Sequence, residues 1–137
     1  MNKMYESAVV VAAIDPDSVT TGTVSSDEVD MRDFHDLMII IQSGDLASGA
    51  TLNGTLVSGA VTGTTTTTVK TMTEFTDDDD DKQVVMYVRG DQLTANHRYV
   101  KLNLVVTGTV EQSAVILGRP RYAVPTDLAS VDEYAQP

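Results

Sequence analysis

The feature that most constrains the fold is the recurrence of an apolar side chain at every second position over residues 99–107. The apolar members lie on one side of an extended chain: Val100, Leu102, Leu104 and Val106. Lys101 and Asn103 lie on the opposite side. A period of two residues is that of a β-strand with one buried face. The segment therefore predicts a strand that packs on a core with one side and meets water with the other.

Other short apolar segments are separated by turn residues. They cover residues 8–14, 20–24, 37–41, 52–57, 69–75, 83–89 and 113–117. Three consecutive Ile residues favour a strand over a helix at 37–41. Residues 83–89 are largely apolar on both faces, which predicts a central strand. About seven to nine short strands predict an all-β fold, namely a jelly-roll-like antiparallel β-sandwich or a barrel.

The length predicts one domain, because 137 residues fall within the range of about 100–200 residues that one core usually serves. We expect a single β-sandwich over residues 1–137. Residues 1–20 can form an extended N-terminal arm, because an apolar strand between a charged start and a Pro turn can pair with a neighbouring subunit. Residues 124–137 are expected to form a C-terminal tail or a short helix capped by Asp127.

The sequence offers little catalytic chemistry. Cys is absent, which excludes disulfides, thiol redox chemistry and Cys-ligated zinc. His35 and His97 are the only histidines, and neither lies in a known catalytic motif. Residues 77–81 are five consecutive Asp residues without the spacing of an EF-hand, so we expect an extended, solvated loop. We therefore predict a protein that is not an enzyme and uses no cofactor or metal.

The net charge of −11 restricts the possible partners. A chain of this charge repels phosphate backbones and anionic lipid, and the sequence shows no local basic patch. No apolar run approaches the ~18 residues of a membrane helix. The first apolar run is also too short for a typical signal peptide. We expect neither nucleic acid nor membrane as a partner, and folding in the cytosol.

The candidate residues for contact with a partner protein lie near the two ends of the chain: Tyr5, Val9, Val10, Val11, Arg119, Arg121 and Tyr122. The first four belong to the apolar arm, which could add a strand to the sheet edge of a partner. The last three are the only basic-aromatic cluster, and Arg and Tyr are favoured at interface centres. The alternative for this cluster is a strand end whose arginines pair with acidic residues of the same chain.

Four segments carry a family resemblance: residues 29–44 (VDMRDFHDLMIIIQSG), 81–89 (DKQVVMYVR), 99–102 (YVKL) and 117–133 (LGRPRYAVPTDLASVDE). Together they resemble small head-associated structural proteins of tailed bacteriophages. The resemblance implies a capsid decoration, or cement, protein that forms a homo-oligomer, most simply a trimer. It implies the major capsid protein as partner, the capsid exterior of the virion as location, and the host cytoplasm during assembly.

Two other functions fit parts of the sequence. A tail-tube, neck or fibre-associated subunit would keep the protein in the virion but place it in a ring or at a vertex. A carbohydrate-binding β-sandwich would need exposed aromatic side chains as a platform. The absence of Trp and an aromatic content of 5% disfavour this second alternative.

Overall fold

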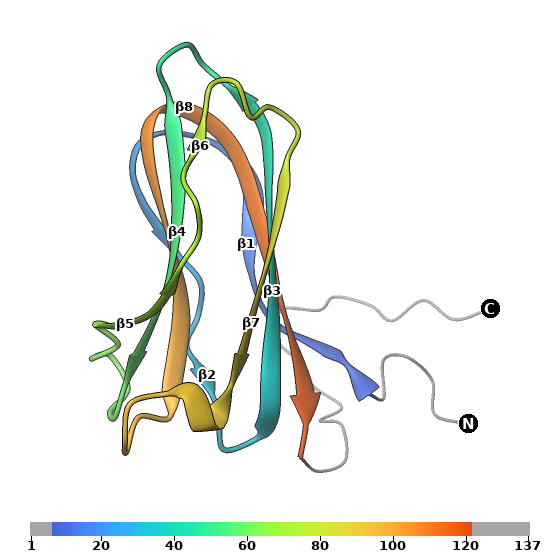
Figure 1. Ribbon diagram of the computed structural model, residues 1–137, viewed down its shortest axis with the longest axis vertical. Helices are drawn as coiled ribbons and strands as arrows, with labels where there is room; N and C mark the ends of the chain where they lie inside the picture. The colour runs from blue at the N-terminus through green and yellow to red at the C-terminus, as the bar shows by residue number, and fades with distance from the viewer. Residues whose placement is uncertain (1–6, 122–137) are drawn as a thin grey trace, which may run out of the picture.

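The computed structural model describes residues 7–121, which are mostly β-strand (Figure 1). The strands are β1 (Val9–Ser25), β2 (Val29–Asp30), β3 (Phe34–Leu46), β4 (Thr51–Gly59), β5 (Thr67–Thr71), β6 (Phe75–Thr76), β7 (Gln83–Arg89) and β8 (Tyr99–Pro120), with a 3-10 turn η1 (Gly90–Gln92) after β7. Every strand pairing is antiparallel. None of the described residues forms a helix long and apolar enough to span a membrane. The predicted all-β fold is confirmed.

The long strand β8 organises the sandwich. Its first half pairs with β4 over residues 99–107, and its second half pairs with β3 over residues 110–120. Its other edge pairs with β1 along most of its length. Between the halves lies Gly108, whose φ of 76° bends the strand. The sheet therefore folds over on itself, and Figure 1 shows β8 arching over the top between the layer of β4 and the layer of β3 and β7.

The core fills the space between these two layers. Leu102 and Leu104 of β8 face it from one layer, and Ile39 and Ile41 of β3 face it from the other. All four side chains are fully buried, so the alternation in the sequence correctly predicts the inward residues. Burial of one such side chain contributes about 1.5–3 kcal/mol. The two layers are held together by this dry contact.

Residues 9–20 form part of β1 and are not a free arm. Val9 pairs with Gly118 and is only 1% exposed, and Val10 pairs with Leu117. The strand finds its partner within the chain because β8 offers it a long free edge. Shifts of register after Val10 and after Ile14 are β-bulges, and a bulge tolerates Pro16, which has no N–H to donate.

The remaining predictions for the chain ends fall outside the described residues. Tyr5 precedes them, and Tyr122 and the predicted tail or helix at 124–137 follow them. Strands predicted at 99–107 and 113–117 are the two halves of β8. The strand predicted at 69–75 is replaced by β5 and β6, which pair separately with β4.

The acidic loop at residues 77–81 folds back onto the turn between β3 and β4, so the prediction of an extended loop is wrong. One carboxylate oxygen of Asp80 accepts a hydrogen bond from the Leu46 N–H at 2.8 Å. One oxygen of Asp77 accepts a hydrogen bond from the Gly49 N–H at 2.6 Å. These bonds satisfy backbone donors of the turn and offset the repulsion between neighbouring carboxylates.

Candidate interaction surfaces

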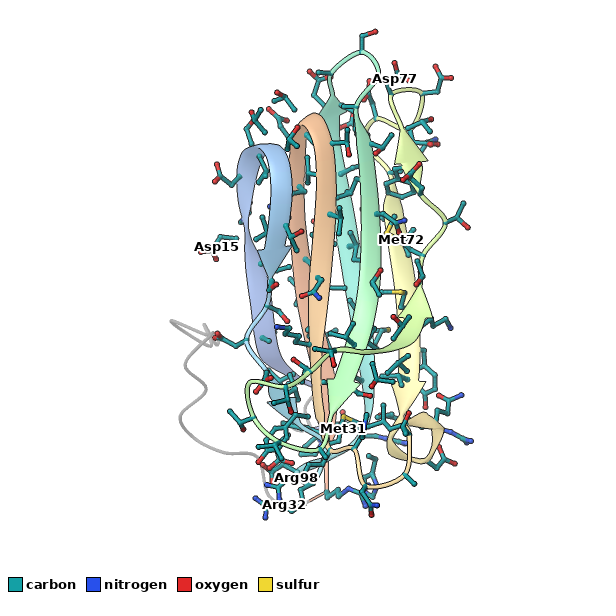
Figure 2. The ribbon with its side chains drawn as sticks, turned by 90° about the vertical axis from the view of Figure 1, so that its left-hand side faces the viewer. Asp15, Met31, Arg32, Met72, Asp77 and Arg98 are labelled. Carbon is teal, nitrogen blue, oxygen red and sulfur yellow. The ribbon has the colours of Figure 1, made fainter. Side chains whose placement is uncertain are left out.

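All arginines of the chain lie at one end of the sandwich, which we call the arginine end: Arg32, Arg89, Arg98, Arg119 and Arg121. They come from the turn before β3, the end of β7 and both ends of β8. The fold-over of β8 brings these distant segments together. Figure 2 shows Arg32 and Arg98 at this end and Asp77 at the opposite end.

Arg119, one of the predicted contact residues, forms a forked ion pair with Asp36. Its Nε and Nη2 atoms lie 3.2 and 2.6 Å from the two carboxylate oxygens. The Tyr87 hydroxyl donates to the same carboxylate at 2.7 Å, and this bond raises the pKa of the phenol. Asp36 is buried, whereas the Arg119 side chain is 60% exposed. The arginine therefore pairs within the chain and still presents its outer surface to a partner.

A second ion-pair cluster surrounds Asp30 in β2. Burial alone would raise the pKa of this carboxyl group, but hydrogen bonds from Arg98 and Arg32 outweigh burial and lower it. The Arg98 Nη2 lies 2.6 Å from the carboxylate, and the Arg32 Nη2 lies at 3.2 Å. The guanidinium of Arg98 also lies 4.8 Å from the centre of the Tyr99 ring, within cation–π range.

Four of the five arginines at this end form ion pairs with carboxylates of the same chain. Arg89 pairs with Asp91 at 3.0 Å, in addition to the pairs at Asp30 and Asp36. The Nε of Arg121 donates to the Phe34 carbonyl at 2.9 Å. Pairing with carboxylates lowers the positive charge that this end presents to a partner.

The opposite end of the sandwich, which we call the acidic end, collects carboxylates: Asp45, Asp77, Asp78, Asp79, Asp80, Asp81 and Glu111. It contains the turn after β3, the loop before β7 and the bend of β8. Asp81 lies against this turn through a backbone hydrogen bond of 3.1 Å to Gly44. The net charge of −11 is therefore distributed unevenly, with an excess of negative charge far from the arginine end.

One outer face of the sandwich carries exposed apolar side chains. This apolar face consists of Met38, Ile40, Val85, Tyr87, Val115 and Leu117. The strand register places them in two rows across β7, β3 and β8. Tyr87, Met38 and Leu117 form one row, and Val85, Ile40 and Val115 form the other.

The exposure of this face overturns the prediction that β7 is a central strand. In the sheet order β5-β4-β8-β3-β7, β7 is an edge strand. Its outward residues Val85 and Tyr87 are 60% and 45% exposed. Apolar residues on both sides of a strand usually indicate that both sides are buried. In β7 the described residues cover the side of Met86 and Val88 and leave the side of Val85 and Tyr87 exposed.

The outer face of the other layer is mostly polar. On β4 and β8 it carries Thr51, Asn53, Thr55, Lys101 and Asn103, and Val105 is its exposed apolar residue, at 43%. An antiparallel sheet with one wet side ordinarily shows this pattern. The two layers thus differ, because the layer of β7, β3 and β8 carries contiguous apolar rows and the layer of β4 does not.

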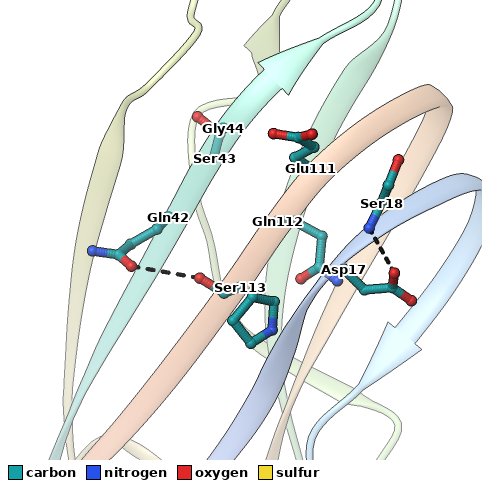
Figure 3. Close-up of a pocket in the computed structure, with 9 residues that line it drawn as sticks. Asp17, Ser18, Gln42, Ser43, Gly44, Glu111, Gln112 and Ser113 are labelled. Carbon is teal, nitrogen blue, oxygen red and sulfur yellow. Dashed lines mark hydrogen bonds between the residues drawn. The ribbon is translucent and has the colours of Figure 1, made fainter.

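A polar groove of about 420 Å³ lies between β1, β3 and β8 (Figure 3). Asp17 accepts a hydrogen bond from the Ser18 N–H at 2.8 Å within it, and the Ser113 hydroxyl lies 3.5 Å from Gln42. Gln112 also lines the groove, and its side-chain amide atoms are buried without a hydrogen-bond partner among the described residues. Residues 7–121 contain no group of three His, Asp or Glu side chains that could hold a metal ion.

The pairing of a histidine with a serine also lacks the access that catalysis needs. His97 Nδ1 lies 2.8 Å from the hydroxyl of Ser58. Ser58 is completely buried on β4, so a substrate would not reach its oxygen. The pair is better explained as a satisfied polar contact in the core.

Comparison with known proteins supports the fold. No family model and no curated protein matches the chain. The chain is similar to the VP2 protein of infectious bursal disease virus in T=1 particles formed by a mutant, with a TM-score of 0.50 and 14% identity over 82% of this chain and 31% of that chain. A VP2 subviral particle gives 0.49 and 16% over 82% and 32%. The Gt strain of the virus gives 0.49 and 14% over 85% and 33%.

The similarity shows a shared class of β-sandwich. The structural neighbours are viral capsid proteins, and the chain spans about a third of their length. At these identities the similarity concerns the fold alone. The resemblance to tailed-phage proteins rests on the sequence segments alone and is independent of these structural neighbours.

Proposed function

We propose that the chain is a non-enzymatic structural protein of a tailed-phage virion, which binds the outer surface of the capsid and bridges capsomers as a decoration, or cement, protein. The observation that carries the proposal is the unequal distribution of charge between the two ends of the sandwich. The arginine end, where β1 begins and β8 ends and most guanidinium groups are paired, is suited to contact with protein. The acidic end is suited to water and to repulsion between particles.

The physical role follows from how a shell fails. Packaged DNA presses outward, so capsomers separate at their seams. A protein that buries surface across a seam gains this binding free energy only on the assembled lattice. Stable interfaces bury roughly 1,200–2,000 Å², and linking subunits into an oligomer multiplies modest affinities. The partner would be the major capsid protein, and the bound form would be a homo-oligomer such as a trimer.

The proposed shell contacts lie at the arginine end. Val10 and Val11 lie at the beginning of β1. Arg119 lies at the end of β8, and Arg121 directly follows this strand. Val10 and Val11 are half-buried and both arginines are exposed. Tyr5 and Tyr122 flank these segments in the sequence and complete the proposed contact.

Charge reversal tests this contact. The double variant Arg119→Glu with Arg121→Glu should weaken retention on purified capsids, because it leaves the charge of Asp36 uncompensated and places negative charge at the contact. The control is Lys70→Glu with Lys82→Glu, which changes the net charge equally at exposed residues outside the arginine end. Equal retention of both double variants would remove the arginine end from the attachment surface.

A further inference from the structure

The apolar face has the composition of a surface that another protein covers. Val85, Tyr87, Met38 and Val115 are each at least 36% exposed, and Ile40 and Leu117 lie between them. From these exposures the face presents on the order of 400–500 Å² of apolar area, a size typical of functional patches on monomers. If this face were exposed to water, polar residues such as Thr, Lys or Asn would be expected at its outward positions, as at most outward positions of the other layer.

The charges around this face are compensated. Asp36 lies one row beyond Met38 and is neutralised by the forked ion pair with Arg119. Arg89 lies beside Asp36 and pairs with Asp91. On the other side, Gln42 and Ser113 form a neutral polar row. Within β7, β3 and β8, every charged residue in the two apolar rows and in the rows that border them has an ion-pair partner. Asp17 and Glu111 lie beyond this border, where they line the polar groove with Gln42 and Ser113.

We propose that this face binds the same face of a second copy of the chain. Two copies of charge −11 repel each other in most orientations. The apolar face is a surface on which they can approach without placing carboxylates opposite carboxylates. Sheets pack face to face through apolar rows in the interior of every β-sandwich, at a spacing of about 10 Å.

The area supports an interface between copies. A stable pair buries about 800 Å² on each partner, with an apolar centre and a polar rim. The apolar face supplies the centre. The bordering rows that contain Gln42, Ser113 and the Asp36–Arg119 pair supply the rim. This inference goes beyond the proposed function, because the association would occur in free solution without a capsid.

The test is the mass of the full chain in solution. Because the contact joins identical faces of two copies, sedimentation equilibrium should give twice 14.7 kDa for the unmodified protein. Val85→Lys should raise the dissociation constant by at least about tenfold, because it places an ammonium group in the apolar rows. The substitution lowers the net negative charge, so any weakening would not come from greater overall repulsion.

The matched control is Val61→Lys. Val61 is 62% exposed, against 60% for Val85, and lies in the turn between β4 and β5. This variant should associate like the unmodified chain. Circular dichroism and thermal melting should show that both variants fold, and Val115→Thr provides a milder change with a smaller expected weakening.

Three results would overturn the inference: a monomeric unmodified chain at all concentrations, unchanged association of Val85→Lys, or equal weakening by Val61→Lys. If the chain is monomeric in solution and Val85→Lys alone loses retention on capsids, the apolar face belongs to the shell contact. The inference then fails while the proposed function stands. If the chain associates through this face but is absent from virions, the proposed function fails and the inference stands.

Discussion

The fold-over of β8 predicts a large and specific effect of a Cβ atom at Gly108. This residue has a φ of 76°, and an added Cβ would lie 2.8 Å from the Cβ of Ala50 and 3.0 Å from its Cα. Gly108→Ala therefore combines two costs. The left-handed conformation costs an L-residue about 1–2 kcal/mol, and overpacking against backbone costs about 1–3 kcal/mol. We expect a loss of about 2–5 kcal/mol, a large part of the 5–15 kcal/mol typical of a domain.

Gly49→Ala separates these two costs. Gly49 has nearly the same φ, 75°, and an added Cβ would meet nothing within 4 Å. This variant should lose only the conformational cost of about 1–2 kcal/mol. With a urea m-value of about 1–3 kcal/mol per molar, the midpoint of Gly108→Ala should lie on the order of 1 M below that of Gly49→Ala. Equal midpoints would show that the bend of β8 does not pack on the turn between β3 and β4, and the two-layer fold would need revision.

Two further predictions concern carboxylates. Asp80→Ala should lower the free energy of unfolding by about 1 kcal/mol, because the Leu46 N–H loses its acceptor, whereas Asp78→Ala should have little effect in the same urea titration; equal effects would refute the folded acidic loop. Asp30 has a pKa below its ordinary value of 3.8, so its ion pairs stabilise the fold above that value and lose this contribution as pH falls through the lowered pKa. Asp30→Asn should therefore destabilise the chain at neutral pH, with a difference that disappears in acid. A difference that persists or grows in acid would contradict this assignment.

The alternation at residues 99–107 was sufficient to predict the buried side of β8, because side-chain period depends only on local backbone geometry. The continuation through Gly108 was not predictable in the same way. Glycine at a strand end is a common turn signal, and the bend becomes visible only when Ala50 is known to pack against it. The same limit applies to β1, whose pairing with β8 is a contact between distant parts of the chain.

The interaction surfaces were predictable only in part. Arg119 and Arg121 stand out in the sequence, but Arg32, Arg89 and Arg98 join them only through the topology. The apolar face could have been suspected from Val85 and Tyr87, which alternate with the buried Met86 and Val88. An apolar residue on the second side of a strand is, however, the same signal that a buried central strand gives. The position of β7 at the sheet edge decides between the two.

The most direct test of the proposed function is quantitative mass spectrometry of purified, washed phage particles combined with electron microscopy of the labelled chain. A decoration protein should be present in a fixed ratio to the major capsid protein, with label over the whole outer surface of the shell. Label confined to a vertex or the tail would contradict decoration and indicate a neck, tail or fibre subunit. Absence of the chain from washed particles would contradict a structural role in the virion.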